Sequence, residues 1–129
     1  MNNPKILGQA GEDRCERYLI ENGYKILKRN YFSRYGEIDI IAQNKYSVAF
    51  VEVKTRTDED IDHILMSITK KKQRNITKTA KIYISENEAE DDVLEYRFDV
   101  VILTKENDDF HIEHIKNAFR ATEIQERIW

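Results

Sequence analysis

The chain has 129 residues, of which 40% are hydrophobic and 35% are charged, with 4 glycines and 1 proline. This composition indicates an ordered, charge-rich globular protein and excludes a disordered one. The length predicts a single domain, residues 1–129, that buries roughly two thirds of its unfolded surface. The formal net charge of −3 disfavours non-specific nucleic-acid binding as the main activity, because such binding depends on neutralising phosphates.

The expected compartment follows from the cysteine content and the apolar runs. Cys15 is the single cysteine, so no intramolecular disulfide can form and a reducing compartment is favoured. The segment Met1–Leu7 lacks the apolar core of a signal peptide, and runs such as Val100–Leu103 are too short to span a bilayer. We therefore expect a cytoplasmic protein with no membrane association.

The first half of the chain predicts one helix followed by three extended segments. Ile6–Asn22 has apolar residues spaced for one buried helical stripe, which includes Cys15, and Gly23 is a natural end for that helix. Tyr24–Tyr35 reads as an extended segment that ends in a turn. The strands Glu37–Gln43 and Val48–Arg56 then flank a short polar turn, which predicts a β-hairpin.

The second half predicts one long helix and two strands. The helix covers Ile64–Ser85, and Lys72 interrupts its apolar stripe. The strands are Tyr96–Thr104 and Phe110–Ile115. Two acidic loops are predicted, at Thr57–Asp62 and at Glu86–Glu95. The last segment, Lys116–Trp129, is predicted to form either a short helix or a tail. This order of elements predicts an α/β fold with a mixed central sheet flanked by helices.

The hairpin gathers charged residues at its open end. If Asn44 pairs with Ser47, then Asp39 faces Glu52 and Glu37 lies opposite Lys54, with Arg56 on the same face. The other face is apolar and is expected in the core; it carries Ile38, Ile40, Ala42, Ala49, Val51, Val53 and Thr55.

Facing carboxylates such as Asp39 and Glu52 repel each other, and a divalent cation would relieve this repulsion. Carboxylate oxygens suit Mg²⁺ or Mn²⁺. Ion pairs between these acids and the nearby Lys54 and Arg56 would explain the same charges without a metal. Spacing alone leaves both alternatives open.

Two segments of the hairpin resemble the signature of the PD-(D/E)xK nuclease superfamily, namely Gly36–Asp39 and Phe50–Arg56. The chain more closely resembles the YraN family of uncharacterised bacterial proteins, which is related to archaeal Holliday-junction resolvases. That similarity covers most of the chain, including Gly8–Glu12, Lys72–Arg74 and Arg97–Val100. It implies a restriction-endonuclease-like αβββαβ core.

The resemblance also implies roles for individual residues. Asp39 and Glu52 would be ligands of Mg²⁺ or Mn²⁺. Lys54 would orient the attacking water and stabilise the charge that develops on the phosphate, and Glu12 would assist metal binding. Lys72 is a candidate on other grounds, because its helical stripe directs it towards the sheet and the site. The alternative for Lys72 is that its stem packs while its amine reaches solvent.

These residues together predict a Mg-dependent nuclease, an endonuclease that hydrolyses phosphodiester bonds in DNA, with branched or structured DNA as the expected partner. A homodimer is expected by analogy with the resolvases. The alternative is a catalytically weak or inactive nucleic-acid- or protein-binding module on the same fold. The net charge and the acidic, glycine-free stretch Thr57–His63 keep that alternative open. Cleavage of structured RNA is a third hypothesis.

A run of basic residues marks the predicted second helix. It either forms a solvated surface or binds phosphates. Its members are Lys70, Lys71, Lys72, Arg74, Lys78 and Lys81.

Overall fold

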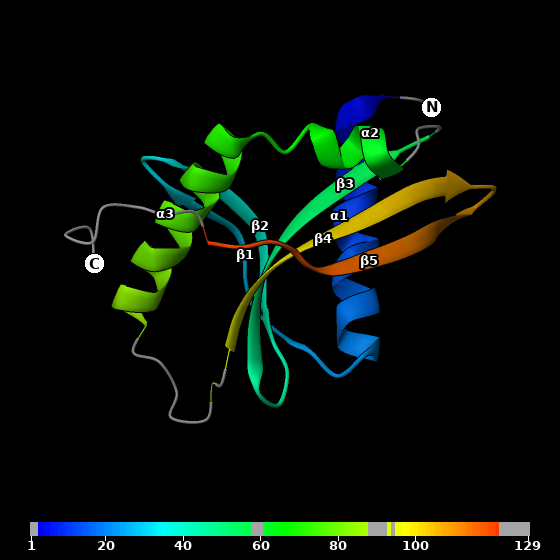
Figure 1. Cartoon of the computed structure of the whole chain (residues 1–129). Helices are drawn as coiled ribbons and strands as arrows, with labels where there is room; N and C mark the ends of the chain where they lie inside the picture. Colours follow the sequence, from blue (N-terminus) through cyan, green and yellow to red (C-terminus); the bar gives the residue numbers. More distant parts are fainter. Residues whose placement is uncertain (1–2, 58–60, 88–92, 94, 122–129) are drawn as a thin grey trace.

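The computed structural model describes residues 3–57, 61–87, 93 and 95–121. It has an α/β architecture in which a five-stranded mixed sheet carries helices on both faces (Figure 1). This confirms the predicted fold class and is compatible with a restriction-endonuclease-like core. The helices are α1 (Pro4–Glu21), α2 (Ile61–Met66) and α3 (Lys70–Glu86). The strands are β1 (Lys25–Ser33), β2 (Gly36–Gln43), β3 (Ser47–Arg56), β4 (Glu95–Glu106) and β5 (Asp109–Phe119).

The strands lie in the sheet in chain order, β1-β2-β3-β4-β5. Neighbours are antiparallel except β3 and β4, which are parallel. A parallel pair needs a crossover connection, and α2 and α3 lie within it. Because β3 is the central strand, its side chains meet helices on both faces of the sheet. None of the helices in the described ranges is long and apolar enough to cross a lipid bilayer.

Helix α1 covers one face of the sheet. Cys15 and Leu19 are fully buried there against a cluster that includes Ile40 of β2 and Val51 of β3. The helix approaches β3 closely because Gly11 has no side chain; a Cβ at this position would collide with the side chain of Thr55. This close approach brings the first half of α1 to the carboxyl end of β3.

Helices α3 and α2 cover the opposite face. Ile76 and Tyr83 of α3 pack against Phe50 of β3, in a cluster that also contains Phe98 of β4. Ile64 of α2 packs with Val100 and Ile102 of β4 in a separate small cluster. The first residues of α3 therefore lie over the central strands.

Two sequence predictions about the second half need correction. The single helix predicted over Ile64–Ser85 is wrong, because α2 ends at Met66 and α3 starts at Lys70. Thr69 causes the break: its side-chain oxygen accepts a hydrogen bond from the backbone N–H of Lys72, which caps the new helix. The last strand is also longer than predicted, since β5 runs to Phe119. The two predicted acidic loops include residues 58–60, 88–92 and 94, and the predicted final segment includes residues 122–129. All of these residues lie outside the described ranges.

The alternation of side chains along β2 breaks at Asp39. Ile38 packs with Ile41 in the cluster under α3, although alternation predicts that it shares a face with Ile40. The cause lies in β1, where Asn30 adopts a left-handed φ of 51° and the β1–β2 pairing omits Asn30 and Asp39. Asn tolerates this conformation better than most residues. The irregularity therefore falls on a candidate metal ligand.

Candidate functional site

The hairpin of β2 and β3 has the predicted register near its turn. Asn44 donates its backbone N–H to the Ser47 carbonyl over 2.9 Å, and Ile40 pairs with Val51. The ladder ends there. Beyond it, the backbone N–H of Val53 donates to Oδ2 of Asp39 over 2.8 Å. A carboxylate thus replaces a backbone carbonyl as the partner of β3, which anchors Asp39 at the open end of the hairpin.

Asp39 lies in a strongly negative part of the protein. Burial and the nearby charge of Glu52 raise its pKa to about 7, although the hydrogen bond from Val53 opposes this. The charges of Glu12 and Glu37 raise the pKa further. Four carboxylates from α1, β2 and β3 therefore repel one another here, and a bound cation would offset that repulsion.

Glu52 is buried, with 7% of its surface exposed, and it holds two lysines. Its Oε2 lies 2.7 Å from Nζ of Lys72 and 3.5 Å from Nζ of Lys54. The amine of Lys72 thus points from α3 into the carboxylate cluster, as its place on the apolar stripe suggested. This contact explains how a lysine can lie on a helix face that otherwise packs against the sheet.

Lys54 is half-buried beside the same carboxylate. Burial lowers its pKa, and the positive charges of Lys72 and Arg56 add to this effect while Glu52 opposes it. Two lysine amines therefore share one acid, and Lys72 disfavours the charge of Lys54.

Glu12 is held on α1 by two residues of β1. Its Oε1 accepts hydrogen bonds from Arg29 over 3.2 Å and from Asn30 over 3.4 Å. Arg29 also contacts Asp13 and Glu16, so one guanidinium serves three acids of the helix. The sequence assigned no role to Arg29 or Asn30. The acidic spacing at 12, 13 and 16 was the signal that α1 required a basic partner.

Glu37 has a different partner from the one the register implied. Its Oε2 accepts a hydrogen bond from Nδ2 of Asn30 over 2.9 Å, and Lys54 instead contacts Glu52 of its own strand. Asn30 thereby links Glu37 to Glu12. The left-handed backbone at Asn30 aims its amide at both acids, and linear spacing does not reveal this bridge.

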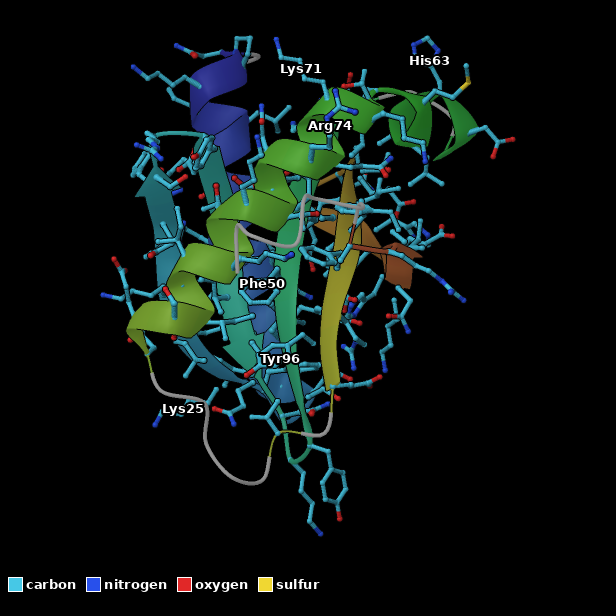
Figure 2. All side chains as sticks on the ribbon, turned by 60° about the vertical axis from the view of Figure 1, so that its left-hand side comes forward. Lys25, Phe50, His63, Lys71, Arg74 and Tyr96 are labelled. Carbon is cyan, nitrogen blue, oxygen red and sulfur yellow. The ribbon has the colours of Figure 1, made fainter. Side chains whose placement is uncertain are left out.

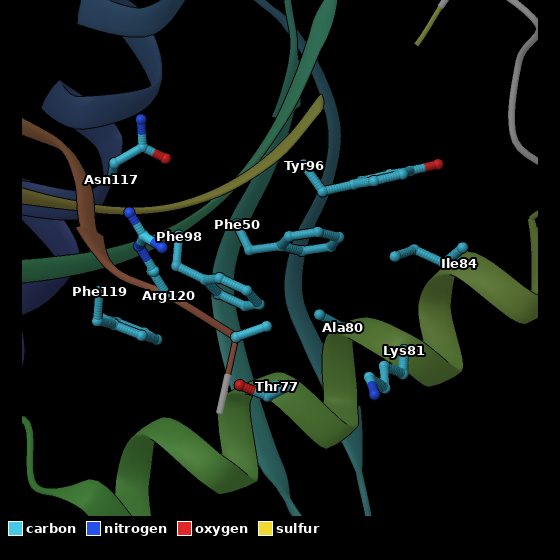
Figure 3. Close-up of a pocket in the computed structure, with 11 residues that line it drawn as sticks. Phe50, Thr77, Ala80, Lys81, Ile84, Tyr96, Phe98, Asn117, Phe119 and Arg120 are labelled. Atoms are coloured by element: carbon cyan, nitrogen blue, oxygen red, sulfur yellow. The ribbon is translucent and has the colours of Figure 1, made fainter. Parts of the chain in front are cut away.

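A polar cleft of about 250 Å³ opens beside these residues, between the first half of α1 and the end of β3. Glu12 and Lys54 both line it, with Arg56 at its β3 side. A second pocket, of about 270 Å³, lies between α3 and β4–β5 (Figure 3). Its walls are mainly apolar and aromatic, and no carboxylate lines it. Of these two pockets, the cleft is lined by both an acid and a lysine, so it is the better site for phosphate chemistry.

The candidate ligands for a divalent metal are Asp39 and Glu52. Among the residues that the structure describes, no three His, Cys, Asp or Glu side chains form a ready-made metal site. Oδ1 of Asp39 accepts no hydrogen bond from any of these residues, so it is available to a cation. Mg²⁺ commonly binds one or two carboxylates and keeps several waters. The donor set therefore fits Mg²⁺ or Mn²⁺, provided that Lys72 moves away from Glu52.

The fold and the site define a class: an α/β protein whose mixed sheet presents two acids and a lysine at the open end of its central hairpin. The family model described as Uncharacterised protein family UPF0102 matches residues 11–103. The chain belongs to this family, and the resemblance to the YraN family is confirmed.

Several relatives match nearly the whole chain. It is 49% identical to a UPF0102 protein of Sulfurihydrogenibium sp. (strain YO3AOP1), over 87% of this chain and 92% of the relative. It is 45% identical to a UPF0102 protein of Lachnoclostridium phytofermentans, over 92% of this chain and 97% of the relative. The similarity therefore includes all the elements that build the site.

Proposed function

We propose that this protein is a metal-dependent endonuclease that hydrolyses phosphodiester bonds in DNA, with branched or otherwise structured DNA as its substrate. The observation that carries the proposal is the convergence of Asp39, Glu52 and Lys54 beside a polar cleft. The clustered acids supply the negative charge that a metal site needs, and a bound cation would relieve their mutual repulsion. The lysine contributes positive charge where a phosphate would enter.

Each residue has a distinct role in this proposal. Asp39 and Glu52 hold Mg²⁺ or Mn²⁺, and the metal supplies Lewis-acid polarisation of the phosphate when bound. Lys54, which lines the cleft, orients the attacking water and stabilises charge on the phosphoryl oxygens. Glu12 assists metal binding from α1, and Arg29 fixes its orientation. Lys72 contacts a substrate phosphate once it leaves Glu52.

The test is a cleavage assay on linear, forked and four-way DNA with Mg²⁺ or Mn²⁺. Wild type should cleave at least one substrate and lose this activity in EDTA. Glu52→Gln and Asp39→Asn should each reduce the rate by about 100-fold or more, because they remove the charge that holds the metal. Glu95→Gln is the matched control, since this exposed glutamate pairs with Ser47 at the end of the sheet opposite to Lys54 and should leave the rate unchanged.

Two outcomes would contradict the proposal. One is the absence of cleavage on every substrate with either metal. The other is equal cleavage by wild type and Glu52→Gln, which would indicate a contaminating nuclease. Calorimetry separates metal binding from turnover, since Asp39→Asn should weaken Mn²⁺ binding even where no substrate is cut.

A second function has one observation in its favour: Lys72 and Lys54 already neutralise Glu52. A protein in which these contacts persist would bind nucleic acid or a protein partner without cleaving it. Such a module would bind DNA equally well in EDTA and in Mg²⁺ and would show no turnover. Structured RNA belongs in the same assay, because phosphodiester hydrolysis does not by itself select the sugar.

A further inference from the structure

The outward face of α3 carries positive charge that the proposed chemistry does not use. Lys70, Lys71, Arg74 and Lys78 fall within an arc of about 100° of the helix, at 3.6 residues per turn. Figure 2 shows Lys71 and Arg74 projecting from the first turns of α3. Two other members of the basic run do not belong to this face, since Lys72 contacts Glu52 and Lys81 is buried.

These four side chains lack acidic partners among the described residues, unlike the three arginines that are held by carboxylates. Arg14, Arg29 and Arg97 each form ion pairs with carboxylates. Lys70, Lys71, Arg74 and Lys78 form no ion pair with any residue in the described ranges. Their charges therefore add to an uncompensated positive field on one side of the candidate site.

The turn between β1 and β2 extends this face with an aromatic ring. Nζ of Lys78 lies 4.8 Å from the centre of the Tyr35 ring, and the Arg34 guanidinium lies 5.0 Å from it. Arg34 also donates a hydrogen bond to the Tyr35 hydroxyl over 2.8 Å. Cation–π contacts hold the two cations in place, and the ammonium of Lys78 and the remaining N–H groups of Arg34 can still donate to an anion. A second contact fixes the turn to the helix, since Ser33 hydrogen-bonds to Thr79.

We propose that Arg34, Tyr35, Lys70, Lys71, Arg74 and Lys78 form a phosphate-backbone track, which binds one strand of DNA where it leaves the candidate site. The inference rests on the proposed function for its substrate class. Lys71 directly precedes Lys72, which contacts Glu52, so the track begins one residue from the site. At the border formed by α1, in contrast, the basic residue Arg29 is already occupied by three acids of that helix.

The test measures DNA affinity by fluorescence anisotropy in EDTA, where neither metal binding nor cleavage contributes. Arg74→Glu with Lys78→Glu should weaken binding of a labelled forked duplex by about tenfold or more at low salt. It should also reduce the slope of log affinity against log salt by about two. Arg74→Gln with Lys78→Gln removes the charge more gently and should give a smaller loss in the same direction. Thermal denaturation checks that both variants fold.

Lys45→Glu with Lys105→Glu is the matched control. Both lysines are exposed, and each lies over an aromatic ring, Lys45 over Tyr46 at 5.3 Å and Lys105 over Phe110 at 5.4 Å. The net charge changes equally in both double variants. The track predicts near wild-type affinity for this control.

Three results would overturn the inference: no DNA binding by wild type, equal losses in both double variants, or displacement of DNA by polyglutamate as readily as by unlabelled DNA. The last would define a general polyanion surface that also serves acidic proteins. Failure of the proposed function is distinguishable from failure of the track. DNA binding that depends on the track, without any cleavage, would support the track and contradict the nuclease. Cleavage by wild type, with unchanged DNA affinity in the variant carrying both Arg74→Glu and Lys78→Glu, would support the nuclease and contradict the track.

Discussion

Nζ of Lys72 lies 2.7 Å from Oε2 of Glu52, a carboxylate that we propose as a metal ligand. Burial alone would lower the pKa of Lys72, but its contact with Glu52 outweighs burial and raises the pKa. A charged amine therefore sits where a divalent cation would have to bind. Lysine and metal compete for the same oxygen, so the site has to exchange one cation for the other.

Replacing Lys72 tests this competition. Lys72→Met should tighten Mn²⁺ binding by about fivefold, equivalent to ~1 kcal/mol, because Glu52 no longer has to release an ammonium. The same variant should cleave DNA more slowly, because a phosphate contact is lost. Calorimetry measures the affinity. Lys71→Met is the control, since Lys71 is exposed and should change the affinity much less; identical affinities in wild type and Lys72→Met would contradict the competition.

Lys54 should affect turnover more than metal binding. Lys54→Met removes a positive group from the cleft but leaves both candidate ligands in place, so the cleavage rate should fall by about 100-fold. Because Lys54 lies farther from Glu52 than Lys72 does, Mn²⁺ affinity should rise by less than in Lys72→Met. Single-turnover rates and calorimetry on the same preparation separate the two effects. If Lys54→Met lost metal binding and activity together, the lysine would be acting through the structure of the site.

The close packing of α1 on β3 depends on Gly11. Gly11→Ala should destabilise the protein by about 1–3 kcal/mol, because the new Cβ collides with Thr55 and forces the helix away from the sheet. Gly8→Ala is a control on the same helix, where a Cβ meets nothing within 4 Å; it should stabilise by about 0.5–1 kcal/mol through helix propensity. Urea denaturation of the pair measures both values, and equal effects would refute the packing account.

A buried polar network ties β4 to α1 and β5. Asp99 is fully buried and accepts hydrogen bonds from Arg97 and His114, each over 2.8 Å, and from the backbone N–H of Asn117. His114 in turn contacts the hydroxyl of Tyr18 over 2.9 Å. Burial alone would raise the pKa of Asp99, but the bonds from His114 and Arg97 outweigh it and lower the pKa. The folded state therefore favours the ionised carboxyl.

Asp99 should contribute stability at neutral pH that is lost in acid. Because its pKa is lower in the folded than in the unfolded state, its contribution is complete above the unfolded value of about 3.9 and declines as pH falls below it. Asp99→Asn should cost about 3 kcal/mol at pH 7, since the buried Arg97 loses its closest carboxylate. Arg97 keeps the Tyr24 hydroxyl and Glu95, which is 3.8 Å away. The difference between wild type and variant should shrink steadily below about pH 4.

Urea denaturation across this pH range measures the effect. Asp109→Asn is the control: the pKa of Asp109 is also lowered, chiefly by the Phe110 N–H and Arg14, but the side chain is exposed. Its pH dependence should be much weaker. A difference between wild type and Asp99→Asn that stays constant from pH 7 to pH 3 would show that the network does not act through charge.

Much of the fold could be predicted because its signals are local. The periodicity of α1, the alternation in the hairpin and the polar turn at Asn44–Ser47 fixed both the element order and the register of β2 against β3. The break before α3 was missed because Ile68 continues the apolar spacing, while the capping role of Thr69 depends on one hydroxyl. In the structure, Ile68 lies between α2 and α3 and packs against Val100 and Ile102 of β4.

The site was predictable as a set of residues and less so as a geometry. Glu52 and Lys54 contact each other as their spacing on β3 suggested, but Asp39 lies where the alternation of β2 breaks, bonded to the backbone N–H of Val53. The partner of Glu37 was missed because the left-handed conformation of Asn30 has no periodic signature. The contact between Lys72 and Glu52 was only suggested, since it requires α3 to dock at one particular height above the sheet.

The position of the crossover has a consequence for how the chain acquires its site during synthesis. Glu12, Asp39, Glu52 and Lys54 all lie in the segment that ends with β3, whereas Lys72 follows it. A growing chain can therefore assemble α1 and the first three strands, with all four residues, before α3 is complete. Glu52 therefore acquires its closer ion-pair partner, Lys72, only after the other residues of the candidate site have been synthesised.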